Sequence, residues 1–388
     1  MKIDNFIIDV DKASDELNQL SDTLKYLLYE NDEKVFDQFE FDKEYLEPSL
    51  FYYFFKNKGQ DQKLNYRQYI VNNYIGNLPL KFDIDIDCFK NARIPEAGFV
   101  VSPKQTSIIY DNEKYYFQNG EQLHITEDRN LKNSNIRISS VVPNILHQYH
   151  PSGFEHNIIE IQKDVLKDLN KAYDNLSKYS PEFTQLLNMT TKEISVFNLP
   201  KTPSFASINY FGTSFINIHE RKHNDILFMD EIAHQSGHSI FTLLTRDSDS
   251  YFLFPPQTLL KNFTGFSGEG RTLYGAFHSM FTLCTIIHTL NAFLLNGNPN
   301  EYEKIELYGR IGFYLDKLIY DVEIISKLEI FTPKGKQIYQ MLAENMTDYQ
   351  KLENGIFLKF NYDNQDYLFS PNRFLISNQS ILHEAQIS

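Results

Sequence analysis

The spacing of apolar side chains along the chain predicts a protein made mainly of helices. The leucines at 17, 20, 24, 27 and 28 recur near helical intervals, so residues 12–58 are expected to be mostly helical. Further helices are predicted at 155–178, 224–244, 271–295, 301–327 and 335–352, the second of them beginning at Asn224 as its N-cap.

Shorter segments show the two-residue alternation that is typical of strands. Residues 81–89 alternate apolar and acidic side chains, which predicts a strand with one buried face. Hairpins are predicted at 107–120 and 356–369, and two more strands at 195–199 and 205–218, the last of them bent at Gly212.

These elements predict a mostly helical α+β fold, with a small antiparallel sheet leading into a metal-binding helix and then a long buried helix. The chain has 388 residues, of which 42% are hydrophobic, so a sizeable core is expected. We expect residues 1–150 to form an N-terminal α+β region that takes part in substrate recognition, and residues 151–388 to form a metal-binding catalytic domain.

The charge balance narrows the range of partners and compartments. The 51 acidic and 37 basic side chains give a net charge of −14, whereas nucleic-acid binding needs concentrated Lys and Arg. Cys88 and Cys284 lie far apart and predict neither a disulfide framework nor a CxxC site. Acidic side chains stand where a secretion signal would be apolar, so we expect a cytoplasmic protein.

One stretch is long enough to cross a bilayer. No Asp, Glu, Lys or Arg occurs between Thr272 and Asn300. Because His278, His288, Asn291 and several Thr interrupt the apolar run, we interpret it as a helix buried in a protein core and not as a membrane span.

Two segments compete as a metal site. His219–Glu220–Arg221–Lys222–His223 is a literal HExxH string, but its polar flanks favour a surface turn. The second segment holds His234 and His238, four residues apart, so a helix places both rings on one face within reach of one ion.

The neighbours of the second segment favour it as the metal helix. Gly237 lowers helix propensity, which indicates that something approaches the backbone closely there. Glu231 lies one turn before His234 and is expected either to support a ligand imidazole or to be a ligand itself. The alternative is two core histidines that hydrogen-bond to the backbone.

A third ligand is predicted on the buried helix. His278 follows Arg271 by seven residues, so a helix projects both side chains from nearly the same face, with Gly275 between them. A buried Arg needs an anion, so we expect Arg271 to bind a carboxylate in a cavity beside the metal. The alternative is an Arg at the helix start that pairs with Glu269 or with solvent.

Gln235 bears on which reaction a metal at this site would support, hydrolysis or oxygenation. In HExxH hydrolases a Glu at this place deprotonates the metal-bound water, and Gln is not a base. Iron oxygenase chemistry needs open coordination positions and a cation for the far carboxylate of a keto acid, which Arg271 would supply.

Residues 213–295 resemble the HExxH-type 2-oxoglutarate-dependent peptide β-hydroxylases of ribosomal peptide natural products. The shared features are a strand leading into a metal helix, then an R-x-L-x-G-x-x-H run present as Arg271, Leu273, Gly275 and His278. The resemblance implies Fe(II), 2-oxoglutarate, O₂ and a peptide substrate that is hydroxylated on its side chains.

The metal helix departs from the family pattern in either register. His234 and His238 occupy the motif with Gln235 in place of Glu, or Asp230 replaces the first His and His234 is the second. We favour the first register because it needs no substitution at a ligand position. It predicts iron bound by His234, His238 and His278, with Arg271 on 2-oxoglutarate and a peptide or bulky small molecule as substrate.

Two other functions compete with the oxygenase. The first is a zinc-dependent hydrolase or peptidase that uses Glu231 or the HERKH string. The second is a non-catalytic peptide-binding relative on a decayed metalloenzyme scaffold.

Overall fold

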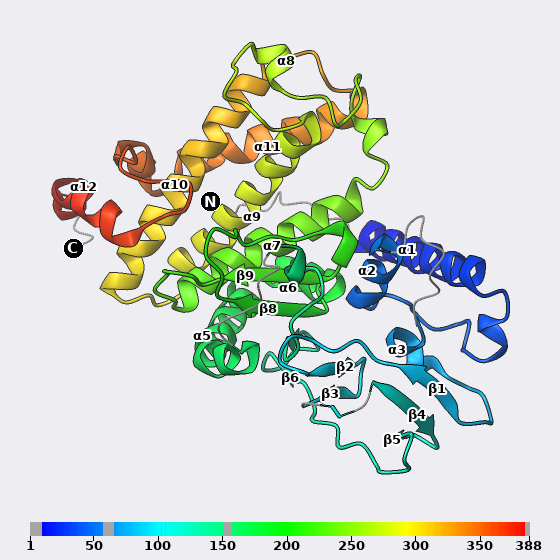
Figure 1. Cartoon of the computed structure of the whole chain (residues 1–388). Helices are drawn as coiled ribbons and strands as arrows, with labels where there is room; N and C mark the ends of the chain where they lie inside the picture. Colours follow the sequence, from blue (N-terminus) through cyan, green and yellow to red (C-terminus); the bar gives the residue numbers. More distant parts are fainter. Residues whose placement is uncertain (1–9, 57–65, 102, 105, 150–156, 385–388) are drawn as a thin grey trace. The chain divides into compact units, whose positions relative to one another are not determined.

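The computed structural model describes residues 10–56, 66–101, 103–104, 106–149 and 157–384 (Figure 1). The helices are α1 Val10–Asn31, α2 Pro48–Lys56, α3 Arg67–Ile70, α4 Leu146–Tyr149, α5 Ile158–Tyr179, α6 Pro181–Thr190, α7 Asp225–Leu244, α8 Lys261–Thr264, α9 Leu273–Asn296, α10 Glu301–Ile325, α11 Pro333–Gln350 and α12 Pro371–Glu384. The strands are β1 Leu80–Asp83, β2 Ala92–Ile94, β3 Gly98–Val100, β4 Ser107–Asp111, β5 Lys114–Phe117, β6 Arg129–Asn130, β7 Arg137–Ile138, β8 Glu193–Phe197 and β9 Thr213–Asn217. Short 3₁₀ segments are η1 Val35–Asp37, η2 Val71–Asn73, η3 Ile208–Tyr210, η4 Ser248–Tyr251 and η5 Leu352–Lys359.

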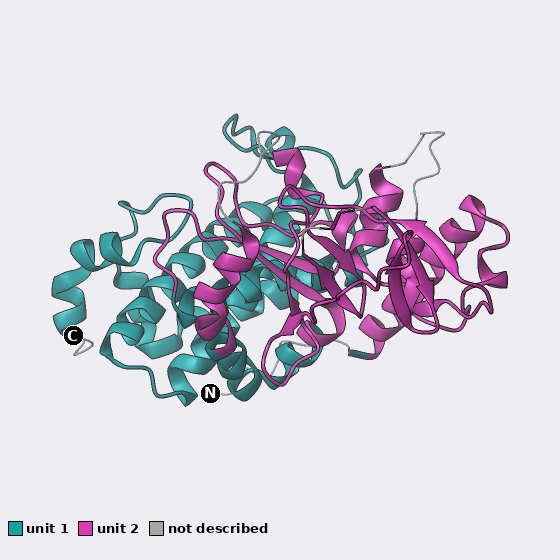
Figure 2. Ribbon diagram, turned by 60° about the horizontal axis from the view of Figure 1, so that its bottom comes forward, with its two compact units in different colours: residues 1–10, 171–186, 224–388 teal, residues 11–170, 187–223 magenta. Residues whose placement is uncertain are grey.

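The chain forms two compact units, each assembled from separate stretches of sequence (Figure 2). Unit 1 contains the described parts of residues 1–10, 171–186 and 224–388, and unit 2 those of residues 11–170 and 187–223. A division near residue 150 into an N-terminal region and a catalytic domain stays a prediction.

Unit 2 contains the strands. Two antiparallel sheets, β1-β4-β5 and β2-β3, accompany a four-stranded sheet of order β6-β7-β8-β9. In the larger sheet β6 and β7 are antiparallel, whereas β7-β8 and β8-β9 are parallel. Every residue of β8 and β9 is buried, which agrees with the apolar, two-sided burial of parallel strands.

Unit 1 is helical, and α9 forms its centre. Helix α9 packs against α7, α10 and α11, and α12 packs against α10. By length and composition α9 could cross a membrane, but 67% of its most apolar window is buried inside the protein. The fold class is therefore confirmed as mostly helical α+β with small antiparallel sheets.

Most predicted elements occur, with two clear exceptions. Helices α5, α7, α9, α10 and α11 and the β4-β5 hairpin match the predicted segments, and β1 covers only the first half of the strand predicted at 81–89. The hairpin predicted at 356–369 is wrong, because that segment contains η5 and turns. The strand predicted at 205–218 begins only at Thr213, after a 3₁₀ turn and Gly212 with φ of +89°.

Candidate functional site

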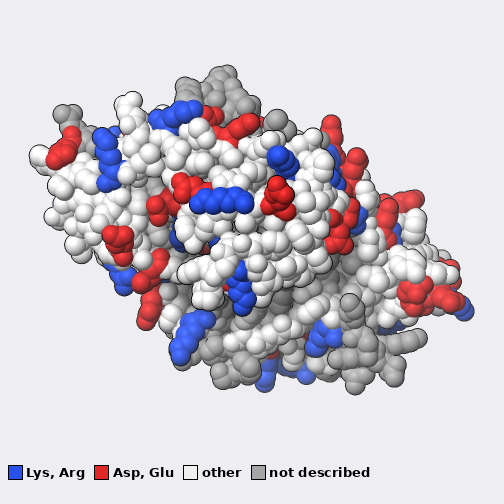
Figure 3. All heavy atoms as spheres, turned by 90° about the horizontal axis from the view of Figure 1, so that it is seen from above, with Lys and Arg blue, Asp and Glu red and all other residues white. Residues whose placement is uncertain are grey.

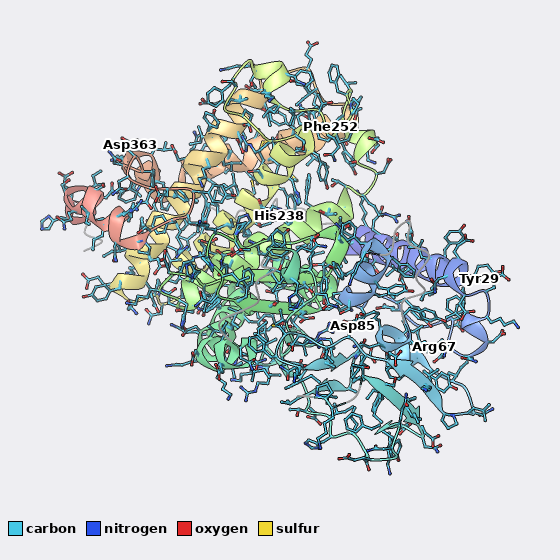
Figure 4. The ribbon with its side chains drawn as sticks, viewed as in Figure 1. Tyr29, Arg67, Asp85, His238, Phe252 and Asp363 are labelled. Carbon is cyan, nitrogen blue, oxygen red and sulfur yellow. The ribbon has the colours of Figure 1, made fainter. Side chains whose placement is uncertain are left out.

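Helix α7 of unit 1 carries His234 and His238, which are two of its few partly exposed residues. His238 is labelled in Figure 4. The start of α7 is fixed by Asn224, whose side chain accepts a hydrogen bond from the Leu227 N–H group, as predicted from the sequence. Nearly all of the helix is buried, which explains why its sequence shows no polar face.

The close approach of α7 and α9 explains Gly237. A Cβ atom at this residue would lie 2.7 Å from Thr285 Oγ1 and 3.3 Å from Thr282 Cγ2. Thr285 in turn donates a hydrogen bond of 3.1 Å to the carbonyl of Ala233 on α7. The prediction of a close neighbour at Gly237 is confirmed, and that neighbour is the helix that carries His278.

The three predicted histidines lie together. The His234 and His238 ring centres are 4.9 Å apart, and those of His238 and His278 are 4.4 Å apart at nearly right angles. His238 Nδ1 lies 3.1 Å from His278 Nε2. Phe241 stacks on the His278 ring with 5.3 Å between centres, which holds that ring in place.

Burial makes two of these rings weak bases. Loss of hydration lowers the pKa of His278 to about 4, although a hydrogen bond to the His238 carbonyl opposes the shift. Burial, with the neighbouring His278 and His234, lowers the pKa of His238 well below its ordinary value. Both imidazoles are therefore neutral at physiological pH, which is the state that binds metals.

As they stand, the rings do not surround one point. Among the described residues, no three His, Cys, Asp or Glu side chains form a group that could hold a metal ion. His278 Nε2 lies 2.9 Å from the His238 carbonyl oxygen, and this contact occupies the nitrogen that also faces the His238 ring. The donor atoms suit a divalent transition metal, but His278 must release the carbonyl to bind one through Nε2.

Asp230 and Glu231 have different surroundings. Asp230 is fully buried, 2.6 Å from Arg310 Nη1, and accepts a hydrogen bond of 2.7 Å from the Tyr314 hydroxyl. Burial raises its pKa despite Arg310. Glu231 instead lines a cavity and lies 3.4 Å from the Gln235 side-chain nitrogen. Arg310 and Tyr314 both contact Asp230 Oδ2, whereas its Oδ1 is buried and has no hydrogen-bond partner among the described residues.

Arg271 binds two carboxylates of the protein itself. Its Nη1 and Nη2 donate to Asp321 at 2.8 and 2.7 Å, and its Nε and Nη2 donate to Glu269 at 3.0 and 2.6 Å. The predicted need for an anion is met by these two side chains. Arg271 also precedes the N-cap Thr272 of α9, so the argument that it shares a helical face with His278 does not apply.

Gly275 does not provide space for a ligand. It is absent from the residues that line the cavity, and its N–H group bonds to Thr272, the N-cap. A Cβ atom there would meet Thr272 Oγ1 at 3.2 Å, so its small size serves the start of the helix.

The HERKH string is a surface turn in unit 2, as favoured from the sequence. It lies between β9 and α7, and Glu220 has a positive φ of 55°. His219 Nδ1 contacts Asn198 at 2.8 Å and His223 Nδ1 contacts Asp168 at 2.9 Å, so the two rings have separate partners.

A cavity of about 570 Å³ adjoins the histidine cluster, within unit 1. This volume is in the range of sites for small molecules or single side chains of a peptide. Its lining comprises Glu231, His234, Arg271, Ser279, Thr282, Leu283, Tyr314, Asp316, Lys317, Ile319, Tyr320, Asp321, Glu323, Tyr367 and Leu368.

Sequence reasoning missed the contribution of α10 to this cavity. Tyr314, Lys317 and Asp321 all come from that helix, and none belongs to a recognisable motif. The available signal was the presence of charged side chains at helical spacing inside a largely apolar helix, which by itself is typical of many surface helices.

No protein-family model matches the chain, and no curated protein is significantly similar to it. The resemblance to the peptide β-hydroxylases therefore stays a prediction.

Proposed function

We propose that the chain is a metal-dependent oxygenase in which His234, His238 and His278 bind one Fe(II) ion. The observation that carries this proposal is the meeting of three imidazoles from two largely buried helices, one of which, that of His234, lines a cavity. The low pKa values of His238 and His278 support it, because metal and proton compete for the same nitrogen lone pair.

The residues around the three histidines favour a catalytic role for them over a purely structural one. Two buried histidines kept neutral could remain as core residues, but His234 also lines the cavity together with Glu231. A bound metal would supply Lewis-acid and redox chemistry at its open positions. Phe241 and the close contact of α7 with α9 would keep water from the far side of the rings.

The substrate is proposed to be a peptide side chain or a bulky small molecule. The cavity volume suits a group of this size, and Tyr314, Tyr320 and Tyr367 present rings or hydroxyls to it. The proposed cosubstrate is 2-oxoglutarate, but the Arg271 side chain does not fit the role of binding it, since Glu269 and Asp321 occupy the guanidinium.

A zinc-dependent hydrolase is the second candidate, and Glu231 is the observation that favours it. This buried carboxylate lines the same cavity as His234, where it could accept a proton from an attacking water molecule. Gln235 does not decide against this candidate, because Glu231 approaches the cavity from the preceding turn of α7.

Metal content and product analysis test the proposal together. The purified protein, loaded with Fe(II) without oxygen and freed of excess metal, is expected to retain one iron per chain. His278→Gln should lose that iron, whereas His288→Gln, on the same helix, should keep it. Succinate formed from 2-oxoglutarate with O₂ supports the oxygenase, and cleavage of a peptide library with Zn(II) but without a keto acid supports the hydrolase. Absence of stoichiometric metal in wild type would contradict both.

A further inference from the structure

Lys317 on α10 lines the cavity of unit 1 and has no carboxylate within ion-pair distance among the described residues. Its Nζ donates a hydrogen bond of 2.9 Å to the carbonyl oxygen of Tyr367, which also lines the cavity. Arg271, the other strongly basic residue of the lining, instead donates to Glu269 and Asp321. The Lys317 amine is therefore not held in a salt bridge, and it lies at the wall of a space that a small molecule can enter.

Aromatic rings position this amine and reduce its hydration. Nζ lies 4.0 Å from the centre of the Phe313 ring, which is buried, and 5.0 Å from that of Tyr367. Burial lowers the pKa of Lys317 to about 8, although nearby aspartates oppose the shift. A lysine that is partly unprotonated near neutral pH is a nucleophile, because only the free amine has a lone pair to donate.

The rest of the lining indicates which molecules the amine would meet. Four carboxylates and two strongly basic groups line the cavity, namely Glu231, Asp316, Asp321, Glu323, Arg271 and Lys317. This excess of negative charge disfavours an anionic ligand and leaves a neutral one unaffected. The side chains of Tyr314, Tyr320 and Tyr367 suit a ring, and a volume of about 570 Å³ is large enough for one.

We propose that the Lys317 amine forms an imine with a neutral, aromatic aldehyde bound in this cavity. The ammonium group first gives one proton to solvent, and the nitrogen lone pair then forms a bond to the carbonyl carbon. The carbonyl oxygen leaves as water with the two protons of the amine, and a C=N bond remains. This condensation needs no oxidant or reductant, and it does not depend on the proposed metal site.

Lys334 provides a matched comparison within the same chain. Its Nζ also donates a hydrogen bond of 2.9 Å, to Ser250 Oγ, and lies 4.3 Å from the centre of an aromatic ring, that of Tyr251. Lys334 is exposed, however, and does not line the cavity. The two lysines thus differ mainly in burial and in access to the cavity.

Reductive trapping with benzaldehyde tests the proposal. The full-length protein is incubated with benzaldehyde and cyanoborohydride at about pH 7, and benzylated lysines are located by peptide mass spectrometry. Lys317 should be labelled about ten-fold or more faster than Lys334, since a lysine with a pKa of about 8 has more free amine than one at the ordinary value of about 10.4. The rate at Lys317 should also saturate with benzaldehyde, as expected for a bound aldehyde.

Two variants and a second aldehyde complete the test. Lys317→Arg keeps the positive charge and should lose the fast, saturable labelling, whereas Lys334→Arg should keep it. The anionic 4-carboxybenzaldehyde, with its rate divided by its rate on Nα-acetyllysine, should label Lys317 several-fold less than benzaldehyde does. Labelling of Lys317 that is no faster than that of Lys334, or that rises in proportion to benzaldehyde without saturating, would overturn the imine site. Equal normalised rates for the two aldehydes would overturn the assignment of a neutral ligand.

Discussion

Gly237 on α7 lies so close to Thr285 on α9 that a side-chain carbon at residue 237 would stand 2.7 Å from the threonine hydroxyl. Thr285 is held in this position because its hydroxyl is directed at the carbonyl oxygens of Ala233 and Thr282. The contact sets the separation of the two helices that carry His238 and His278. It also explains why glycine interrupts a buried helix.

We expect Gly237→Ala to lower the free energy of unfolding by about 1–2 kcal/mol, because overpacking outweighs the gain in helix propensity. Urea denaturation of the metal-free protein measures this loss. Gly270→Ala is the control, since a side-chain carbon there meets nothing within 4 Å. A Gly237→Ala protein as stable as wild type would show that the helix contact does not constrain the site.

Variants of the Asp230–Arg310 ion pair test whether Asp230 is a structural carboxylate or a metal ligand. Both side chains are buried, so Arg310→Met should destabilise the protein by about 3–5 kcal/mol, because it removes the cation that pairs with Asp230 and Glu306. The double variant Asp230→Asn/Arg310→Met should recover part of this loss, as measured by denaturation. Asp230→Asn alone should retain the iron, and its loss from this folded variant would favour the register with Asp230 as a ligand.

The buried histidines predict a pH dependence of stability in the metal-free protein. His278 has a pKa of about 4 when folded and an ordinary value near 6.5 when unfolded, so the unfolded chain binds more protons in between. Stability should therefore be complete above about pH 6.5 and fall as the pH drops toward 4, by on the order of 3 kcal/mol from this ring. His278→Gln should flatten the profile over this window in urea titrations, and an unchanged slope would contradict the assignment.

Lys317 should titrate unusually low for a lysine. Burial lowers its pKa to about 8, with Arg271 acting in the same direction and Asp230, Asp321 and Asp316 opposing it. Heteronuclear NMR of the methylated metal-free protein should show one lysine signal that titrates near this value. That signal should vanish in Lys317→Arg and persist in Lys327→Arg. Ordinary titration of every lysine signal would contradict the half-buried position of this side chain.

The helices of the site could be predicted from the sequence because helix caps and residue spacing are local features of the chain. Asn224 marks the start of α7 by an N-cap, and the charge-free run after Thr272 marks α9. The four-residue spacing of His234 and His238 follows from the helix itself. The meeting of these rings with His278 depended on one further inference, that two buried helices pack together.

The partners of Arg271 could not be predicted from local sequence pattern. Asp321 lies fifty residues from Arg271 in sequence, and only the packing of α10 on α9 brings it to the guanidinium. The distribution of charge does not mark the site either. On the face seen in Figure 3, acidic and basic side chains are interspersed. Long-range ion pairs leave no periodic signal in the chain.

The false hairpin at 356–369 has a different cause. Its alternating aromatic residues face other rings instead of a partner strand, as Phe357 does with Tyr308 and Phe369 with Phe313. Positive φ angles at Glu353, Asn354 and Gly355 turn the chain before an extended run can form. An alternation of aromatic and polar residues is therefore compatible both with a strand and with an irregular segment that packs on helices.

The central claim is that the rings of His234, His238 and His278 share one metal ion. A crystal of the iron-loaded protein, measured at the iron absorption edge, tests it directly. We predict one anomalous peak within about 2.2 Å of a nitrogen from each ring, with His278 turned away from the His238 carbonyl. A map with no peak there, or with iron held by the surface histidines of the 219–223 turn, would contradict the proposed function.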